Sequence, residues 1–228
     1  MHQEKHFSQN EVVRDVVIGM SDGLTVPFAL AAGLSGVLSN NHLIMIAGLA
    51  EICAGSIAMG LGGYLAGQTE VDHYNAEEAR EFDEIKTKYE FEKQEVRDVF
   101  EEYGLSKESQ NLIADELAKD DKKWVDFMMK FELGLEKPDE KRATKSAFNI
   151  GIAYIIGGLI PLSGYIIADT PERGLIFSSV ITVFCLFVFG YFKSKLTGQN
   201  PIKGALRVTF IGVIAAGAAY MLSLYFGA

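Results

Sequence analysis

Long apolar runs and one long polar block alternate along the chain. Five apolar runs lie at about residues 16–38, 43–67, 147–168, 174–192 and 207–227. Each is close to the roughly 20 residues that a helix needs to cross the hydrocarbon core of a bilayer. The polar block at 70–145 is rich in good helix formers and poor in turn signals. The pattern predicts an all-α fold: a five-span transmembrane helical bundle with a three-helix insert between spans 2 and 3.

The chain is therefore expected to have three parts. Residues 1–69 hold an N-terminal segment and transmembrane helices 1 and 2, residues 70–145 form an acidic helical domain, and residues 146–228 hold transmembrane helices 3 to 5. The first apolar run is a full span with Asp22 inside it and lacks a small-residue cleavage pattern. We therefore expect a retained span and not a signal peptide.

Turn and cap residues outline the helices of the insert. One helix is expected to continue from the second span through about 70–103, with a break near residues 88–91 left open. The other boundaries are marked by capping signals: Gly104 ends this helix, Ser106 caps a second helix to about 118, and Asp120 or Asp121 caps a third that ends near Gly134.

Charge is concentrated in the insert. Residues 70–145 hold 23 of the 30 acidic and 14 of the 21 basic residues, so this block accounts for the whole net charge of −9. Soluble enzymes spread charge over their surface, and disordered acidic proteins lack long apolar runs, so both classes are disfavoured. A nucleic-acid partner is not expected either, because no basic patch is present to neutralise phosphates.

Basic residues near the ends of the apolar runs indicate the orientation in the membrane. The connection at 39–42 carries no basic residue, and that at 169–173 carries one beside two acidic residues. The basic residues gather instead before the third span and after the fourth: Lys141, Arg142, Lys145, Lys193, Lys195, Lys203 and Arg207. We therefore expect the N-terminus and residues 70–145 in the cytosol and the C-terminus on the far side of the membrane.

Two acidic residues within the spans are candidates for a cation path. Burying a charge in hydrocarbon costs at least roughly 3 kcal/mol, so intramembrane acids usually face a partner or a water-filled path. Asp22 lies in the first span and Glu51 in the second, and Met59 follows Glu51 on roughly the same side of the helix. A thioether beside carboxylates suits ferrous iron better than magnesium. Simple packing of Met59 and hydrogen-bonded or protonated carboxylates remain alternatives.

Small residues recur every four positions in the first two spans. Such faces let helix backbones approach closely. The pairs are Gly19 with Gly23, Ala58 with Gly62, and Gly63 with Gly67. We expect these positions to mark close helix packing.

Acidic residues of the insert are spaced so that several share one helix face. The sets are Glu77, Glu81 and Glu84, then Glu92 and Glu95, then Met128 and Glu132. Like charges at this spacing destabilise a helix unless water or a cation lies between them. Spacing alone leaves both open, and the Glu-x-x-His of di-metal bundles is absent.

Three features together resemble a known family. They are the run Asp-Gly-Leu-Thr-Val-Pro-Phe-Ala-Leu at 22–30, the stretch Glu51-Ile-Cys-Ala-Gly-Ser-Ile-Ala-Met59-Gly, and the acidic insert between the second and third of five spans. Over nearly its whole length the chain looks like the vacuolar iron transporter family of plants, fungi and protozoan parasites. The insert distinguishes this branch from shorter nodulin-like relatives.

The resemblance implies a function and a set of site residues. Members of this family are homodimers of the vacuolar membrane that move ferrous iron, and often manganese, from cytosol to vacuole in exchange for protons. It implies that Asp22, Glu51 and Met59 line the transport path between the subunits. It also implies a cytosolic metal-binding domain whose ligands are Glu81, Glu84, Glu92, Glu95, Met128 and Glu132, with Met129 as the alternative to Met128. The metal would be substrate, and no prosthetic group is expected.

Two other classes of protein compete with a transporter. One is a membrane-anchored protein that sequesters or senses metal without transport. The other is a membrane oxidase with a di-metal carboxylate centre, which usually recruits histidines, whereas the insert holds only His73. A transporter accounts for the span acids and the insert acids together, so we expect a transporter and not an enzyme.

Overall fold

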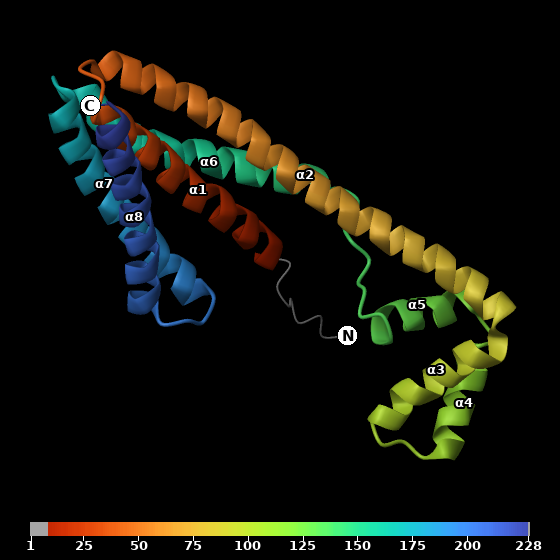
Figure 1. Cartoon of the computed structure of the whole chain (residues 1–228). Coiled ribbons are helices and arrows are strands. Elements are labelled where there is room, and N and C mark those ends of the chain that lie inside the picture. The colour runs from red at the N-terminus through yellow and green to blue at the C-terminus, as the bar shows by residue number, and fades with distance from the viewer. Residues whose placement is uncertain (1–8, 228) are drawn as a thin grey trace. The chain divides into compact units, whose positions relative to one another are not determined.

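The structure, a computed structural model, describes residues 9–227, with side chains from Glu11 onwards. These residues form helices and no strand, which confirms the all-α class (Figure 1). The helices are α1 (Gln9–Ser35), α2 (Asn41–Thr87), α3 (Tyr89–Glu102), α4 (Lys107–Leu117), α5 (Asp121–Phe131), α6 (Arg142–Ile167), α7 (Pro171–Leu196) and α8 (Pro201–Gly227).

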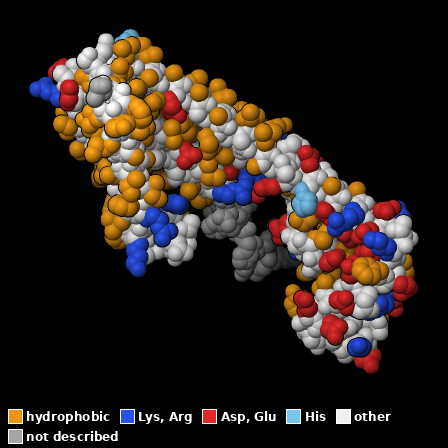
Figure 2. All heavy atoms as spheres, viewed as in Figure 1, with side chains coloured by type: hydrophobic (Ala, Val, Ile, Leu, Met, Phe, Trp, Pro, Cys, Tyr) orange, Lys and Arg blue, Asp and Glu red, His pale blue; other side chains and the backbone are white. Residues whose placement is uncertain are grey.

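Five of these helices, α1, α2, α6, α7 and α8, are long and apolar enough to cross a membrane, as predicted. The chain divides into two compact units. One contains the chain up to Leu65 and from Ala143 onwards, and the other is Ala66–Arg142. Hydrophobic side chains cover the first unit, whereas acidic and basic side chains crowd the second (Figure 2). Helix α2 contributes to both units, since its apolar first part belongs to the spans and its polar last part to the insert.

Glycines set the close packing of α6 against α1 and α2. A Cβ atom added at Gly19 or Gly23 would overlap a backbone carbonyl oxygen of α6, so α1 and α6 touch through their backbones. At Gly60 of α2 an added Cβ would lie 3.0 Å from the Ala147 carbonyl oxygen. The predicted close packing is thus confirmed for Gly19 and Gly23. The same prediction is wrong for Gly62 among the described residues of one chain, because nothing lies within 4 Å of a Cβ added there.

The first helix of the insert is the last part of α2. It ends directly before the stretch at 88–91, where the sequence allowed a break. Helix α2 ends at Thr87, Lys88 takes φ −128° and ψ 35°, and α3 starts at Tyr89. One continuous helix over 70–103 is therefore wrong. The break separates α3 from α2 and allows the two helices to take different directions.

Capping side chains start the next two helices of the insert as expected. The Ser106 hydroxyl accepts a hydrogen bond from the Ser109 N–H, and the Asp120 carboxylate accepts one from the Lys123 N–H. Each bond satisfies an N–H group that has no partner inside the helix. The N-cap of α5 is therefore Asp120 and not Asp121. Helix α5 ends at Phe131, three residues before Gly134.

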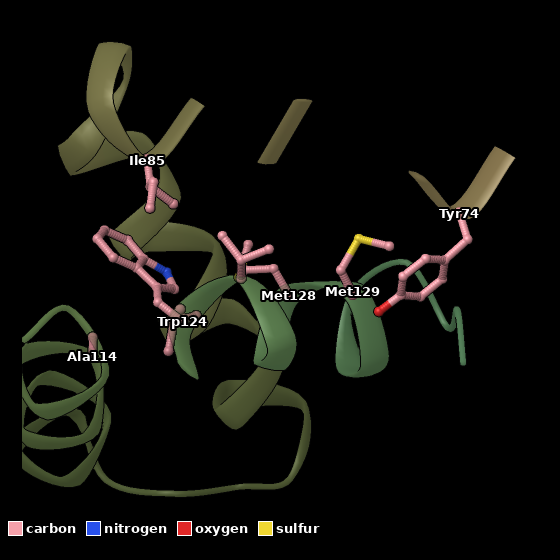
Figure 3. Packing of buried hydrophobic residues seen from close by; sticks show 8 residues of the cluster. Tyr74, Ile85, Ala114, Trp124, Met128 and Met129 are labelled. Atoms are coloured by element: carbon pink, nitrogen blue, oxygen red, sulfur yellow. The ribbon is translucent and has the colours of Figure 1, made fainter. Parts of the chain in front are cut away.

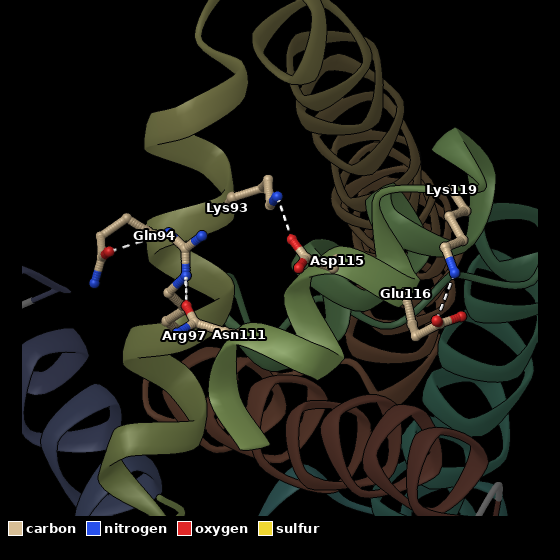
Figure 4. Close-up of polar contacts among 7 residues, drawn as sticks. All are labelled: Lys93, Gln94, Arg97, Asn111, Asp115, Glu116 and Lys119. Carbon is tan, nitrogen blue, oxygen red and sulfur yellow. Dashed lines mark hydrogen bonds and ion pairs between the residues drawn. The ribbon is translucent and has the colours of Figure 1, made fainter. Parts of the chain in front are cut away.

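The insert has an apolar core of its own. Trp124, Val125 and Met128 of α5 are buried with Ile85 of α2 and Val96 of α3 (Figure 3). Polar contacts on the outside tie α3 to α4: Lys93 pairs with Asp115 at 2.5 Å, and Arg97 donates to Asn111 at 2.8 Å (Figure 4). The insert helices thus hold a fixed arrangement among themselves.

Candidate metal centre

Three carboxylates from two helices meet at the break after α2. One oxygen each of Glu81, Glu84 and Glu92 lie within 4.8 Å of one another. In a continuous helix, Glu81 and Glu92 would be separated by about 16 Å along the axis at 1.5 Å per residue. The break at Lys88 removes this separation by ending α2 and starting α3 in a new direction. The cluster is therefore a product of the break and not of spacing on one helix.

Two of these carboxylates are buried without adequate partners. Glu81 is 2% and Glu92 1% exposed. Glu81 Oε2 and both Glu92 oxygens are buried and have no hydrogen-bond partner among the described residues. Glu84 is half-buried and pairs with Lys88 at 2.7 Å. Burying unpaired carboxylates costs several kcal/mol each, so the cluster is stable only when protonated or neutralised by a cation.

The pKa values of the cluster show how strongly charge is disfavoured there. Burial, then repulsion from Glu95 and Glu81, raises the pKa of Glu92 to about 8. Burial and repulsion from Glu84 raise the pKa of Glu81 as well. Packing against protein, with repulsion from Glu95 and Glu81, raises the pKa of Glu132 to about 7. Glu132 still has an exposed side chain at the C-cap of α5, so water screens it and its shift is the weaker indication.

The shared repulsion places Glu95 and Glu132 in the same acidic cluster as Glu81, Glu84 and Glu92. Two basic side chains, Lys88 and Arg80, lie beside the cluster, and neither was singled out from the sequence. Lys88 pairs with Glu84. The Arg80 guanidinium lies 3.8 Å from Glu81 Oε1 and also pairs with Glu77. Two exposed basic side chains cannot balance the five carboxylates of the cluster, which leaves room for a bound cation.

Met128 and Met129 are both buried in the core of the insert, with 0% and 1% exposure. Met129 lies beside the ring of Tyr74 (Figure 3). The Glu132 N–H bonds to the Met128 carbonyl oxygen at 3.0 Å, so Glu132 follows Met128 by one helical turn. A thioether ligand, and the choice between Met128 and Met129, stay predictions.

A second set of polar groups lies among the spans, where Tyr154 of α6 meets Glu51 of α2. The Tyr154 hydroxyl donates a hydrogen bond to Glu51 Oε1, and Glu51 Oε2 is buried without a partner among the residues that the structure describes. Gly55 makes room for this pair, because an added Cβ would collide with the tyrosine ring and lie 2.8 Å from Glu51 Oε1. Glu51 is thus held by one donor and keeps one free oxygen.

Asp22 of α1 lies near the same tyrosine. It precedes Gly23, which packs against the Tyr154 backbone, and the Asp22 charge interacts with the Tyr154 side chain. Two span acids from different helices therefore share one neighbour on α6. Asp15, one heptad before Asp22, is only 1% exposed and accepts a hydrogen bond from Asn149 at 3.5 Å. Sequence reasoning missed Tyr154 and Asp15; a polar ring inside a span and the seven-residue spacing to Asp22 were the available signals.

Met59 lies two turns beyond Glu51 on α2 and is half-buried. Eight residues correspond to about 12 Å along a helix. One metal ion bonds its ligands at about 2–2.5 Å, so Met59 and Glu51 suit successive positions and not one coordination shell.

Comparison with known proteins is consistent with this arrangement of span acids and an acidic insert. A sequence model of the VIT family matches residues 13–224. The chain belongs to the VIT family. It is 50% identical over 222 residues to "Vacuolar iron transporter 1" of Arabidopsis thaliana, covering 97% of this chain and 89% of the relative. The protein of the same name from Tulipa gesneriana is 49% identical, with 97% and 90% covered. "Protein CCC1" of Saccharomyces cerevisiae is 38% identical, with 92% and 67% covered.

The match spans α1 to α8, so this VIT family member includes both the span acids and the insert cluster in the aligned region. Chemically, the insert offers the buried carboxylate oxygens of Glu81 and Glu92. Carboxylates favour hard divalent cations, and a thioether shifts the preference towards transition metals.

Proposed function

We propose that the protein carries ferrous iron, and also manganese, from the cytosol into the vacuole in exchange for protons. Membership of the VIT family and relatives named vacuolar iron transporters support iron as the cargo and the vacuole as the destination. The observation that carries the proposal is the pairing of two acidic sites in one chain: Glu81, Glu84 and Glu92 in the insert, and Asp22 with Glu51 in the spans.

The insert would collect metal before transport. Its residues 70–145 carry the entire net charge of −9, which raises the local concentration of cations. The cluster of Glu81, Glu84, Glu92, Glu95 and Glu132 would then bind the ion, with Met128 or Met129 adding a thioether. A cation there relieves the repulsion that raises the pKa of Glu92.

The spans would provide the path. Asp22 and Glu51, which both lie near Tyr154, would form a first acidic position, and Met59 would form a second position about 12 Å along α2. A carboxylate binds metal only when it is deprotonated, so protons and metal compete for the same oxygens. A site that opens to an acidic lumen would exchange its metal for protons, and return to the neutral cytosol would release them.

The active form would be a homodimer with its path between subunits. The α2 face with Ala58 and Gly62 supports this arrangement, because both positions are exposed and no atom of residues 9–227 lies within 4 Å of a Cβ added at Gly62. Small residues spaced by four are typical of contacts between membrane helices. The insert and the N-terminus would face the cytosol and the C-terminus the lumen, as the basic residues near the span ends indicate.

The test is ferrous uptake into sealed proteoliposomes under an imposed pH gradient. Wild type should accumulate iron only with the gradient, and Asp22→Asn should abolish uptake while metal still binds to the insert. Asp169→Asn, at an exposed acid between α6 and α7, is the matched control and should transport normally. Uptake by Asp22→Asn at the wild-type rate would disprove the path.

The alternative function predicts a different result in the same assay. A membrane-anchored metal-binding protein would bind iron in detergent, and neither wild type nor Asp22→Asn would fill the vesicles.

A further inference from the structure

A shallow groove of about 560 Å³ runs along one face of α8, near its first turns. Lys203 and Arg207 line one end, and Phe210 and Val213 line the other. Their spacing of three and four residues places them in a row on one helix face. Phe210 is 66% and Val213 45% exposed, so the apolar end is open to the surroundings. The groove is thus cationic at one end and apolar at the other.

The cationic end lies in a region without acidic residues. From Gly174 to Ala228 the sequence contains four basic residues and no aspartate or glutamate. Lys193 and Lys195 end α7, and the turn at 197–200 leads directly to Lys203. Basic side chains gather over this turn (Figure 2). None of the four forms an ion pair with a residue that the structure describes, so their charges are available to an outside partner.

We propose that this groove binds one anionic phospholipid. Lys203 and Arg207 bind the headgroup phosphate, and an acyl chain lies along Phe210 and Val213. The order of these groups along α8 matches the order of phosphate and hydrocarbon in a lipid. Helices α7 and α8 are both candidate spans joined by a short turn, so this end of both helices lies at one membrane surface. Lipid binding in this groove does not depend on whether the protein transports metal.

The expected preference for anionic over neutral phospholipid follows from the two basic side chains of the groove, Lys203 and Arg207. A lysine or arginine near an anionic membrane surface strengthens binding by about fivefold, so both together give a preference of about 25-fold. Screening by salt weakens this preference, as for any contact at the surface.

The test is native mass spectrometry of the full-length protein in detergent micelles doped with phosphatidylserine or phosphatidylcholine. Wild type should retain one phosphatidylserine in preference to phosphatidylcholine. The double variant Lys203→Gln with Arg207→Gln should lose this preference. Lys193→Gln with Lys195→Gln removes the same charge outside the groove and is the matched control. It should keep most of the preference.

Two results would overturn the proposal. One is equal retention of both lipids by the wild type. The other is an equal loss in both double variants, which would indicate general attraction to the surface and no defined site. Arg207→Lys keeps the charge and should keep binding, which separates loss of the site from loss of the fold. Unchanged melting temperatures check the fold of every variant.

Discussion

Metal binding by the insert is expected to depend on pH because protons compete for Glu92. Burial of this side chain, followed by repulsion from Glu95 and Glu81, raises its pKa to about 8. At lower pH the carboxyl group is protonated, and a metal ion must displace the proton before it can bind. The apparent affinity for a divalent cation should therefore fall as the pH decreases through this range.

The size of the effect follows from competition at one site. With a pKa of about 8, protons weaken binding about 100-fold at pH 6, about 11-fold at pH 7 and about twofold at pH 8. Affinity should thus rise about 50-fold from pH 6 to pH 8 through Glu92 alone. A glutamate with its ordinary pKa of 4.5 would change affinity by less than about 1.1-fold over the same range.

The assay is Mn²⁺ binding to the full-length protein in detergent micelles, measured by titration calorimetry at pH 6, 7 and 8. Glu92→Gln removes the titrating group but keeps its shape, so binding at pH 8 should weaken and most of the pH dependence should disappear. Glu90→Gln, at an exposed position of the same helix, should keep the wild-type profile. A wild-type affinity that changes by less than about threefold between pH 6 and pH 8 would refute the reasoning.

Four further outcomes are expected. The folded, metal-free protein binds a proton at Glu92 more tightly than the unfolded chain does, because the pKa of Glu92 is raised in the folded state. This proton stabilises the fold fully below about pH 4.5, and the stabilisation is lost as the pH rises through about 8. The melting temperature should therefore fall over this range in EDTA and recover with Mn²⁺. Met128→Leu keeps the buried volume but removes the sulfur, so weaker Co²⁺ binding than in Met129→Leu would identify Met128 as the ligand. Tyr154→Phe leaves the half-buried Glu51 without its donor and should lower the free energy of unfolding by about 1–3 kcal/mol in chemical denaturation. Gly23→Ala should sharply lower the melting temperature because its Cβ would overlap the Tyr154 carbonyl oxygen, whereas Gly217→Ala, with nothing within 4 Å, should not.

The spans and the caps could be predicted from the sequence because both depend on local rules. A bilayer leaves no water to satisfy backbone groups, so apolar runs of about 20 residues form helices whatever their neighbours are. Ser106 and Asp120 bond to N–H groups three residues away, within reach of the local chain. The glycines of α1 were also predictable, although their partner, α6, was not.

The contacts of the candidate sites could not be predicted in the same way. Tyr154 lies more than 100 residues from Glu51, and no local pattern connects the two. Arg80 has the spacing of an ordinary surface ion pair, and only its distance to Glu81 relates it to the acidic cluster.

By itself the sequence determined the all-α class, five membrane-crossing helices, an acidic insert and the carboxylates available for metal. Its spacing left open whether those acids form a solvated face or a site. The tertiary structure decided which of those acids lie together: α2 ends at Thr87, which brings oxygens of Glu81, Glu84 and Glu92 within 4.8 Å and buries two of the three side chains. The physical reason is that helical spacing sets which residues share a face only within one continuous helix. The direction of the chain after Lys88 depends instead on how α3 and α5 pack around Trp124 and Val96.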